Sequence, residues 1–274
     1  MFVSPHNRIP TLFQEQQRKG QQHGILSVYC TAGFPRLGDT TYILETLQEC
    51  GVDMVEIGMP FSDPVADGPT IQESSTQALQ NGMTTAVLFD QLRHVRATVR
   101  LPLVLMGYVN PVLQFGIEKF CAECADVGID GVILPDLPRE TYLREWKPLF
   151  DKYQLHFIML ITPQTPEARV RSIDAASSGF VYAVSSSGTT GGALAMDDAR
   201  SAYFQRLQHY RTENILSNPV VIGFGIHDKA SFDAACEYAN GAIIGSAFIK
   251  AISGASSTED LKARIHGYLG TIRS

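Results

Sequence analysis

The stretch GVDMVEIGMPFSDPVADGP (residues 51–69) begins as a short apolar run and continues as a loop with three prolines and two aspartates. The run over 52–58 is short and partly β-branched, as buried strands of a parallel sheet are. Side chains alternate along a strand, so Glu56 faces away from its neighbours Val55 and Ile57. A carboxylate is a poor core residue, and Glu56 at the end of a strand therefore indicates a functional group.

A second stretch repeats the pattern. The segment GIDGVILPDLP (128–138) shares the order Gly-apolar-Asp-x-Val with the first, at Asp53 and Asp130. Similar short apolar runs, bounded by Gly, Pro, Asp or Ser, alternate with helical patterns along the chain. The expected strands are 25–31, 52–58, 101–108, 129–136, 155–162, 179–186, 219–225 and 241–247.

Eight strands that alternate with helices predict parallel pairing and right-handed crossovers. Eight such units in about 250 residues predict an α/β fold of the closed (β/α)8 or TIM barrel type, as a single domain over 1–274. A doubly wound open sheet is the alternative, but no G-x-G-x-x-G follows the first strand. Residues 9–20 predict an extra N-terminal helix that covers the N-terminal end of the barrel.

Two intervals between expected strands are long, 59–101 after strand 2 and 187–218 after strand 6. The loops that follow barrel strands build the active site, so long loops at these positions favour lids or binding elements. Three prolines restrict the first of them. The second is rich in Ser, Thr and Gly, which suits a mobile lid.

The composition is that of an ordinary globular protein, with 45% hydrophobic and 18% charged residues among 274. A net charge of −6 gives no basic surface for nucleic acid. No apolar run suggests a membrane span or a signal core, so we expect a cytoplasmic protein. Five scattered cysteines are no disulfide framework. Cys121 and Cys124 are expected on one packed helix face rather than at a metal.

Three side chains are candidates for acid–base chemistry at the barrel mouth: Glu56, Asp67 and Tyr182. Partial burial tends to raise the pKa of Glu56, which would let it exchange protons near neutral pH; a salt bridge to a neighbouring strand is the alternative. Asp67 would share acid, base and charge-stabilising roles with it, or only form a turn before Gly68. The Tyr182 hydroxyl reaches the same mouth if it faces inward, and a structural hydrogen bond is its alternative role.

Glycines near the end of the chain predict a phosphate site. Barrels commonly form one after strands 7 and 8, where backbone N–H groups bind the anion. The segments IGFGI and IIGSAF end those strands and place Gly225, Gly245 and Ser246 there, with Gly191 of the strand 6 loop as a further candidate. Glycines that only form turns are the alternative. No histidine pair, H-E-x-x-H or P-loop predicts a metal or nucleotide site.

The segment VEIGMPFSDPVADGPTIQ (55–72) closely resembles the signature of the tryptophan synthase alpha subunit family. YCTAGFP, MGYVNPV, GVILPDLP, SSSGTTG, IGFGI and GAIIGSAFIK follow in that family's order, so the resemblance covers nearly the whole chain. It implies a (β/α)8 barrel that cleaves indole-3-glycerol phosphate into indole and glyceraldehyde 3-phosphate, without a cofactor. It also implies a partner, the pyridoxal-phosphate-dependent beta subunit, which receives the indole for L-tryptophan synthesis in an alpha2beta2 heterotetramer.

The resemblance assigns roles by motif. Glu56 matches the catalytic acid/base, Asp67 the second catalytic carboxylate and Tyr182 the tyrosine near the reacting carbon. The phosphate-binding positions are Gly191, Gly225, Gly245 and Ser246, and the indole pocket matches Tyr29, Ile71 and Phe224. Ser186 stands where many relatives carry arginine.

The two long loops suggest a coupling between partner and lid. We expect a partner docked on the first loop, which carries Asp63, to favour closure of the second loop and to place Thr190 near Asp67.

Two other classes of function remain open from the residues alone. One is another phosphate-binding barrel enzyme, such as a sugar-phosphate isomerase or epimerase, which would have no reason for the loop PFSDPVADGP. The other is a non-catalytic barrel that only binds a partner, which would not need both Glu56 and Asp67. Release of indole from indole-3-glycerol phosphate distinguishes all three.

Overall fold

The structure, a computed structural model, describes residues 8–18, 24–184, 198–223 and 225–273. The strands form one parallel sheet in the order β5-β4-β3-β2-β1-β9-β8-β7-β6. They are β1 (Ile25–Thr31), β2 (Met54–Gly58), β3 (Leu103–Met106), β4 (Gly131–Ile133), β5 (His156–Phe157), β6 (Met159–Ile161), β7 (Val181–Val184), β8 (Val220–Gly223) and β9 (Gly241–Ile244).

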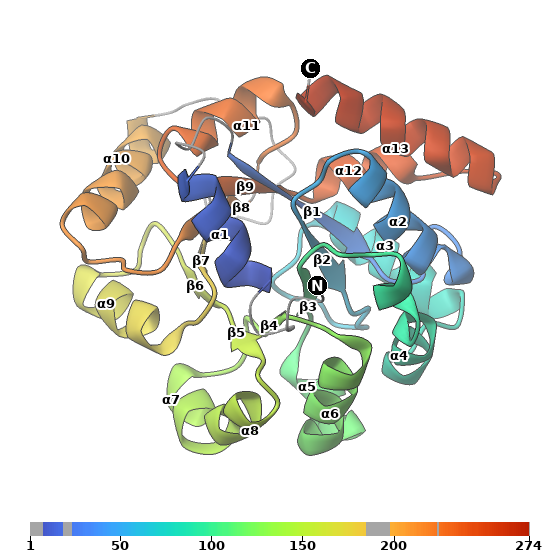
Figure 1. Cartoon of the computed structure of the whole chain (residues 1–274), viewed down its shortest axis with the longest axis horizontal. Helices are drawn as coiled ribbons and strands as arrows, with labels where there is room; N and C mark the ends of the chain where they lie inside the picture. The colour runs from blue at the N-terminus through green and yellow to red at the C-terminus, as the bar shows by residue number, and fades with distance from the viewer. Residues whose placement is uncertain (1–7, 19–23, 185–197, 224, 274) are drawn as a thin grey trace.

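The α-helices lie between the strands in the chain and surround them in space (Figure 1). They are α1 (Arg8–Arg18), α2 (Thr40–Glu49), α3 (Pro69–Gln80), α4 (Thr85–Leu92), α5 (Val109–Phe115), α6 (Ile117–Val127), α7 (Arg139–Thr141), α8 (Lys147–Lys152), α9 (Glu167–Ala176), α10 (Asp198–Thr212), α11 (Lys229–Cys236), α12 (Ser246–Ile252) and α13 (Thr258–Arg273). Short 3₁₀ turns occur at η2 (Leu37–Asp39) and η3 (Val95–Ala97), and Tyr142–Trp146 is π-helical.

The ring of strands closes through one interrupted strand. β5 pairs with β4, β6 pairs with β7, and only Ile158 separates β5 from β6. The Ile158 N–H still donates to the Val132 carbonyl at 3.0 Å, so the segment 156–161 occupies a single position in the ring. The expected fifth strand, 155–162, is therefore present as two short pieces. The predicted (β/α)8 barrel is confirmed.

The repeated Gly-apolar-Asp-x-Val pattern has a structural explanation. Asp53 accepts a hydrogen bond from the Leu26 N–H at 2.8 Å, and Asp130 accepts one from the Leu103 N–H at 2.8 Å. Each aspartate lies just before a strand, β2 or β4, and its partner lies at the start of the preceding strand. The two carboxylates thus fix neighbouring strands to each other at the N-terminal end of the barrel, where buried N–H groups need acceptors.

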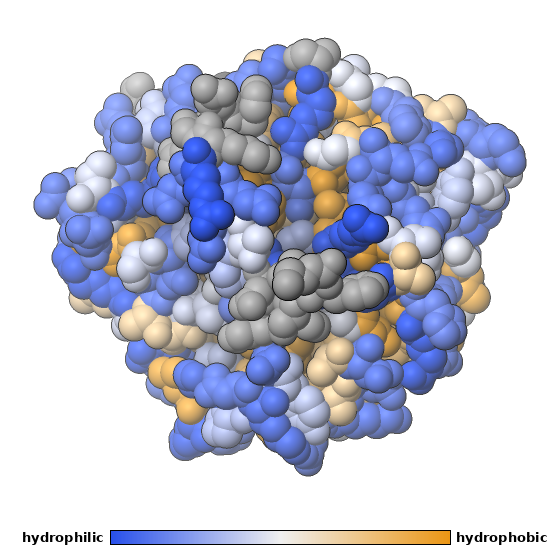
Figure 2. Space-filling model, in the orientation of Figure 1, coloured by the Kyte–Doolittle hydropathy of each residue, from blue (hydrophilic) through white to orange (hydrophobic). Residues whose placement is uncertain are grey.

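Helix α1 covers that same end, as the sequence predicted. Its Phe13 ring packs against Phe180, with centroids 6.1 Å apart, and Phe180 directly precedes β7. Its Arg8 forms an ion pair with Asp130 at 2.8 Å, and Arg96 forms a second one at 2.7 Å. Figure 1 shows α1 lying across the end of the barrel that faces the viewer, and the surface on that side is largely hydrophilic (Figure 2).

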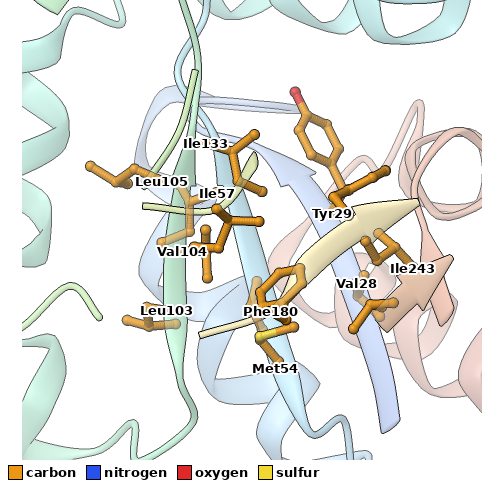
Figure 3. Packing of buried hydrophobic residues seen from close by; sticks show 14 of the residues in the cluster. Val28, Tyr29, Met54, Ile57, Leu103, Val104, Leu105, Ile133, Phe180 and Ile243 are labelled. Carbon is orange, nitrogen blue, oxygen red and sulfur yellow. The ribbon is translucent and has the colours of Figure 1, made fainter. Parts of the chain in front are cut away.

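The core lies inside the ring and between the ring and its helices. Figure 3 shows Val28, Met54, Leu103 and other buried side chains of the strands packed together. Burial of these apolar side chains supplies the main stabilisation of the fold. No helix in the described ranges is long and apolar enough to cross a membrane. Cys121 and Cys124 are buried on α6, as expected, and burial raises the pKa of both thiols.

The two long intervals contain helices as well as loops. After β2, residues 59–68 form the loop, and α3 and α4 account for most of the remaining length. After β7, residues 185–197 lie outside the described residues, and α10 follows. Ser186, Thr190 and Gly191 of the expected lid therefore lie outside the described residues.

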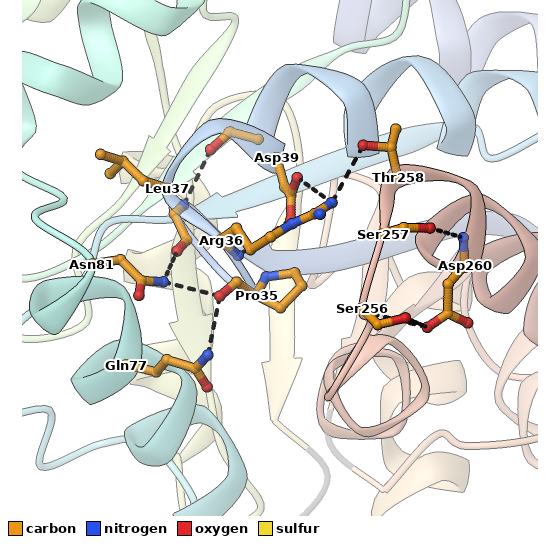
Figure 4. Close-up of polar contacts among 12 residues, drawn as sticks. Pro35, Arg36, Leu37, Asp39, Gln77, Asn81, Ser256, Ser257, Thr258 and Asp260 are labelled. Carbon is orange, nitrogen blue, oxygen red and sulfur yellow. Dashed lines mark hydrogen bonds and ion pairs between the residues drawn. The ribbon is translucent and has the colours of Figure 1, made fainter.

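The loop after β1 is fixed from two sides (Figure 4). Gln77 of α3 and Asn81, which directly follows α3, donate to the Pro35 carbonyl at 3.0 and 2.9 Å. Arg36 donates to the Thr258 hydroxyl at the start of α13, at 3.4 Å. These contacts hold the chain that leaves the C-terminal end of β1, the end at which the candidate site lies.

Candidate active site

A cavity of about 280 Å³ opens at the C-terminal ends of the strands. Its wall includes side chains from β1, β2 and β7 and from the segments that follow β2, β8 and β9. Eight of the predicted site residues line it: Tyr29, Glu56, Asp67, Ile71, Tyr182, Gly225, Gly245 and Ser246. Phe224 and Gly191 lie outside the described residues.

Glu56 reaches the cavity from the interior of the barrel. It lies on β2 beside Tyr29 of β1 and Val104 of β3, and only 1% of its surface is exposed. The Ser27 hydroxyl donates to Oε1 at 3.3 Å, while Oε2 has no hydrogen-bond partner among the described residues. Burial raises the pKa of Glu56 to about 8, and the Ser27 hydrogen bond opposes this only in part. The carboxyl group is therefore mainly protonated at neutral pH.

Asp67 is held by a tyrosine from the next strand unit. The Tyr108 hydroxyl donates to Asp67 Oδ2 at 2.8 Å and accepts from the Ala66 N–H at 3.1 Å. Its ring packs on Phe61, with centroids 5.3 Å apart. Burial raises the pKa of Asp67, and the hydrogen bond from Tyr108 lowers it. The loop 59–68 is thereby tied to the segment after β3, with Asp67 turned towards the cavity.

Two tyrosines fit over glycines of neighbouring strands. A Cβ atom at Gly58 would lie 2.0 Å from the Tyr29 hydroxyl oxygen, and one at Gly223 would lie 2.0 Å from the Tyr182 hydroxyl oxygen. Both rings are buried, and Figure 3 shows the Tyr29 ring extending away from the apolar side chains below it. Burial is the main cause that raises the pKa of Tyr182, and the charge of Glu56 adds to it. The hydroxyl of Tyr182 consequently stays protonated.

The segments after β8 and β9 contribute two glycines and a serine to the cavity wall. Gly225 has a φ of 76°, in the left-handed region that favours glycine. Gly245 precedes α12, and Ser246 is its first residue. His227 Nδ1 lies 3.0 Å from the Gly225 carbonyl oxygen, so the nitrogen carries the proton in that contact. This wall offers N–H groups and a hydroxyl, which are the groups that bind an anion.

The outer side of the loop after β2 is exposed. Asp63 is exposed and accepts a hydrogen bond from the neighbouring Ser62 hydroxyl. Val65 is 80% exposed, although it is apolar. The same loop therefore presents Asp67 to the cavity and an apolar side chain to its surroundings.

Several residues of the site were not anticipated from the sequence. Ser27 and Tyr108 orient the two carboxyl groups, Gly58 gives space to Tyr29, and Lys250 lies on the cavity wall. The only available signal for Tyr108 was its place in the segment MGYVNPV at the end of the third strand. Among the residues whose placement is described, no group of three or more His, Cys, Asp or Glu could hold a metal ion.

The fold and the cavity define a class of protein, a (β/α)8-barrel enzyme whose second strand brings a buried carboxylic acid to the cavity. The sequence model of the family described as tryptophan synthase alpha chain matches residues 13–271. The chain therefore belongs to the tryptophan synthase alpha chain family.

Individual relatives agree with this family. The tryptophan synthase alpha chain of Flavobacterium johnsoniae is 50% identical over 267 residues, which cover 97% of this chain and 100% of the relative. That of Flavobacterium psychrophilum is 53% identical over 244 residues, 89% of this chain and 92% of the relative. A chain of the tryptophan synthase complex from Pyrococcus furiosus superposes with a TM-score of 0.80 at 31% identity, covering 91% of this chain and 98% of that one.

Proposed function

We propose that the cavity at the C-terminal end of the barrel cleaves indole-3-glycerol phosphate into indole and glyceraldehyde 3-phosphate, with Glu56 as the acid/base. Members of the alpha chain family are carbon–carbon lyases of tryptophan biosynthesis, and the chain has this role as the alpha subunit of tryptophan synthase. The observation that carries the assignment to Glu56 is its buried carboxyl group, which has a raised pKa and one oxygen without a described partner.

The reaction needs two proton transfers. The Glu56 carboxylic acid donates its proton to the indole ring carbon that carries the glycerol phosphate side chain. The side-chain hydroxyl next to that carbon then loses its proton to the Glu56 carboxylate, and the C–C bond breaks. The bonding electrons return to the ring, which leaves as indole, and the other fragment leaves as the aldehyde. Glu56 ends in its starting state, and neither a metal nor an organic cofactor takes part.

Asp67 and Tyr182 support these transfers. Ring protonation places positive charge on the indole N–H group, and an ionised Asp67 would stabilise that charge. The hydrogen bond from Tyr108 favours the ionised form of Asp67 and fixes its direction. Tyr182, with its protonated hydroxyl, lines the same cavity and would position the reacting carbon.

The remaining lining residues would bind the two ends of the substrate. Tyr29 and Ile71 are apolar surfaces for the indole ring, and the resemblance adds Phe224. Gly225, Gly245 and Ser246 would hold the phosphate group through N–H groups and a hydroxyl, and the resemblance adds Gly191.

The partner of the alpha subunit is the tryptophan synthase beta subunit, in an alpha2beta2 complex. We propose that the loop 59–68, with Asp63 and the exposed Val65, lies at that contact. Partner binding there would favour closure of the strand 6 loop, with Thr190 approaching Asp67. We also propose that the chain is a single domain and works in the cytoplasm, in line with its composition.

The test of the function is a product assay. Purified protein is incubated with indole-3-glycerol phosphate, and both indole and glyceraldehyde 3-phosphate are measured. We expect equal amounts of the two products. Gly245→Asp should raise KM steeply, because it places a negative charge where the phosphate would bind. Loss of substrate without release of indole would exclude the proposed reaction.

A further inference from the structure

The cavity has little positive charge to balance a phosphate group. The carboxyl groups of Glu56 and Asp67 line it, and the chain as a whole has a net charge of −6. Among the described lining residues, Lys250 is the only lysine or arginine. A phosphate ester that carries nearly two negative charges would therefore meet one permanent positive charge in this cavity, that of Lys250.

The position of Lys250 on α12 directs it towards the proposed phosphate site. It lies four residues after Ser246, so the two side chains share one face of the helix. Helical side chains lean towards the helix N-terminus, which brings the Lys250 side chain back towards Ser246. Phe248 and Ile249 are buried on the other side of the helix, whereas Lys250 is exposed.

Lys250 differs from the other described lysines because its charge has no ion-pair or aromatic partner among the residues that the structure describes. Four of these lysines pair with carboxylates, and the fifth lies over an aromatic ring. The pairs are Lys147–Asp151, Lys152–Glu118, Lys229–Asp233, Lys262–Glu49 and Lys119–Phe115. Lys250 makes no ion pair within the described ranges, so no carboxylate there competes with a ligand for it.

A second feature of the same cavity also indicates a ligand. The buried Oε2 atom of Glu56 has no hydrogen-bond partner among the described residues. Buried polar atoms are rarely left unpaired in folded proteins, so this oxygen is kept for a group that enters the cavity. Glu56 and Lys250 thus offer a proton donor and a positive charge to one ligand.

We propose that Lys250 is a specificity-determining residue, whose ammonium group pairs with the substrate phosphate and selects phosphorylated substrates over free indole compounds. The inference rests on the proposed function, because that function supplies the phosphate position at Gly225, Gly245 and Ser246. It adds a charged side chain to a site otherwise made of neutral groups.

Binding measurements test the inference directly. Glycerol 3-phosphate, inorganic phosphate and indole are titrated by calorimetry into the full-length parent, Lys250→Ala, Lys250→Arg and Lys262→Ala. A charge-assisted contact at a solvent-exposed site predicts a Kd for glycerol 3-phosphate about 5–20-fold higher in Lys250→Ala. The Kd for indole should change less than about twofold, because indole has no phosphate. Lys250→Arg should retain most of the affinity.

Lys262→Ala is the matched control, because it removes the same charge from a residue that pairs with Glu49 and does not line the cavity. Its Kd for glycerol 3-phosphate should equal that of the parent. In the complex with the beta subunit, Lys250→Ala should raise KM for indole-3-glycerol phosphate much more than it lowers kcat, as loss of uniform binding does. Raised salt should weaken glycerol 3-phosphate binding more in the parent than in Lys250→Ala.

The outcomes separate this inference from the proposed function. If the parent releases indole and Lys250→Ala binds glycerol 3-phosphate as tightly as the parent, the role of Lys250 is wrong and the function stands. A parent that releases no indole overturns the function instead. If Lys250→Ala and Lys262→Ala weaken glycerol 3-phosphate binding equally, the effect comes from net charge, and the proposed role of Lys250 is wrong.

Discussion

Glu56, the middle residue of β2, brings a carboxyl group into the barrel, where its side chain is almost completely buried. Ser27 satisfies one carboxyl oxygen, and the other is free of described partners. Burial disfavours the ionised form, so the folded protein holds this proton more tightly than the unfolded chain does. The same property that suits Glu56 to acid–base catalysis therefore makes stability depend on pH.

We expect the free energy of unfolding to fall as the pH rises from about 4.5 to about 8. In this interval the folded state keeps the Glu56 proton and the unfolded state has lost it, so stability decreases by at most about 1.4 kcal/mol per pH unit from this group. Above about 8 both states are ionised and the contribution no longer changes. Urea unfolding of the parent and of Glu56→Gln across the interval measures it. If the free energy of unfolding changes with pH in the same way in the parent and in Glu56→Gln, the pKa of Glu56 is not raised.

Gly58 is the residue whose substitution should most directly disturb the Tyr29 ring. An added Cβ would lie 2.0 Å from the Tyr29 hydroxyl, so Gly58→Ala should lower the free energy of unfolding by about 1–3 kcal/mol. It should also lower kcat/KM for indole-3-glycerol phosphate, because the ring would move within the cavity wall. Gly38→Ala is the control, since no heavy atom lies within 4 Å of its added Cβ. Equal stability of the two variants would show that Tyr29 does not need the glycine.

The orientation of a single side chain could be predicted from the sequence where a local rule, such as strand alternation, determines it. Strand alternation predicted that Glu56 faces away from Val55 and Ile57, and the structure places it on the cavity. Ser27 and Tyr108 were missed because their hydrogen bonds to Glu56 and Asp67 join residues 29 and 41 positions apart in the chain. No local pattern marks such pairs before the strands are placed side by side.

At the level of elements, the sequence located the strands but not their ends. The expected strand 101–108 is β3 (Leu103–Met106), and the fifth expected strand is interrupted at Ile158. A strand ends where its neighbour stops offering hydrogen bonds, and that depends on register rather than on composition. The Asp53 and Asp130 pattern was recognised as a repeat, whereas its role in fixing adjacent strands required the structure.

The ion pairs of Asp130 connect α1 to the barrel, and we expect them to contribute strongly to stability. Asp130→Asn would leave Arg8 and Arg96 beside a neutral side chain, and breaking a buried pair costs about 3–5 kcal/mol. Urea unfolding should show this loss, while kcat of the folded protein stays near that of the parent. Asp233→Asn is the control, because the exposed pair with Lys229 is worth about 0–1 kcal/mol. If Asp130→Asn lowers the free energy of unfolding no more than Asp233→Asn does, Asp130 does not hold α1 on the barrel.

At the scale of the whole molecule, contacts that stabilise the fold lie at one end of the barrel and the candidate active site lies at the other end. Helix α1 and the aspartate contacts occupy the N-terminal end, and the cavity with both candidate catalytic carboxyl groups occupies the C-terminal end. The loop 59–68 connects this cavity to the molecular surface, where Val65 is exposed. A partner that covers this loop can therefore act on the site without reaching into it.

We expect the beta subunit to increase the rate of indole formation several-fold to about a hundredfold, a range typical of coupling between two sites. Asp63→Ala should reduce this activation, because Asp63 lies on the exposed side of the loop, and should leave the rate without the partner nearly unchanged. Asp90→Ala, on the exposed surface of α4, is the control. A parent rate that does not respond to the beta subunit, or full activation of Asp63→Ala, would contradict the role of the loop.

The most direct measurement is the turnover of indole-3-glycerol phosphate by Glu56→Gln, together with the affinity of this variant for glycerol 3-phosphate. Glutamine keeps the size of the side chain and removes the exchangeable acid. An acid/base group contributes about 10²–10⁴ in rate, so kcat should fall by that factor or more while the Kd for glycerol 3-phosphate stays within about twofold. Turnover close to that of the parent, in a variant that binds normally, would show that Glu56 is not the acid/base of this enzyme.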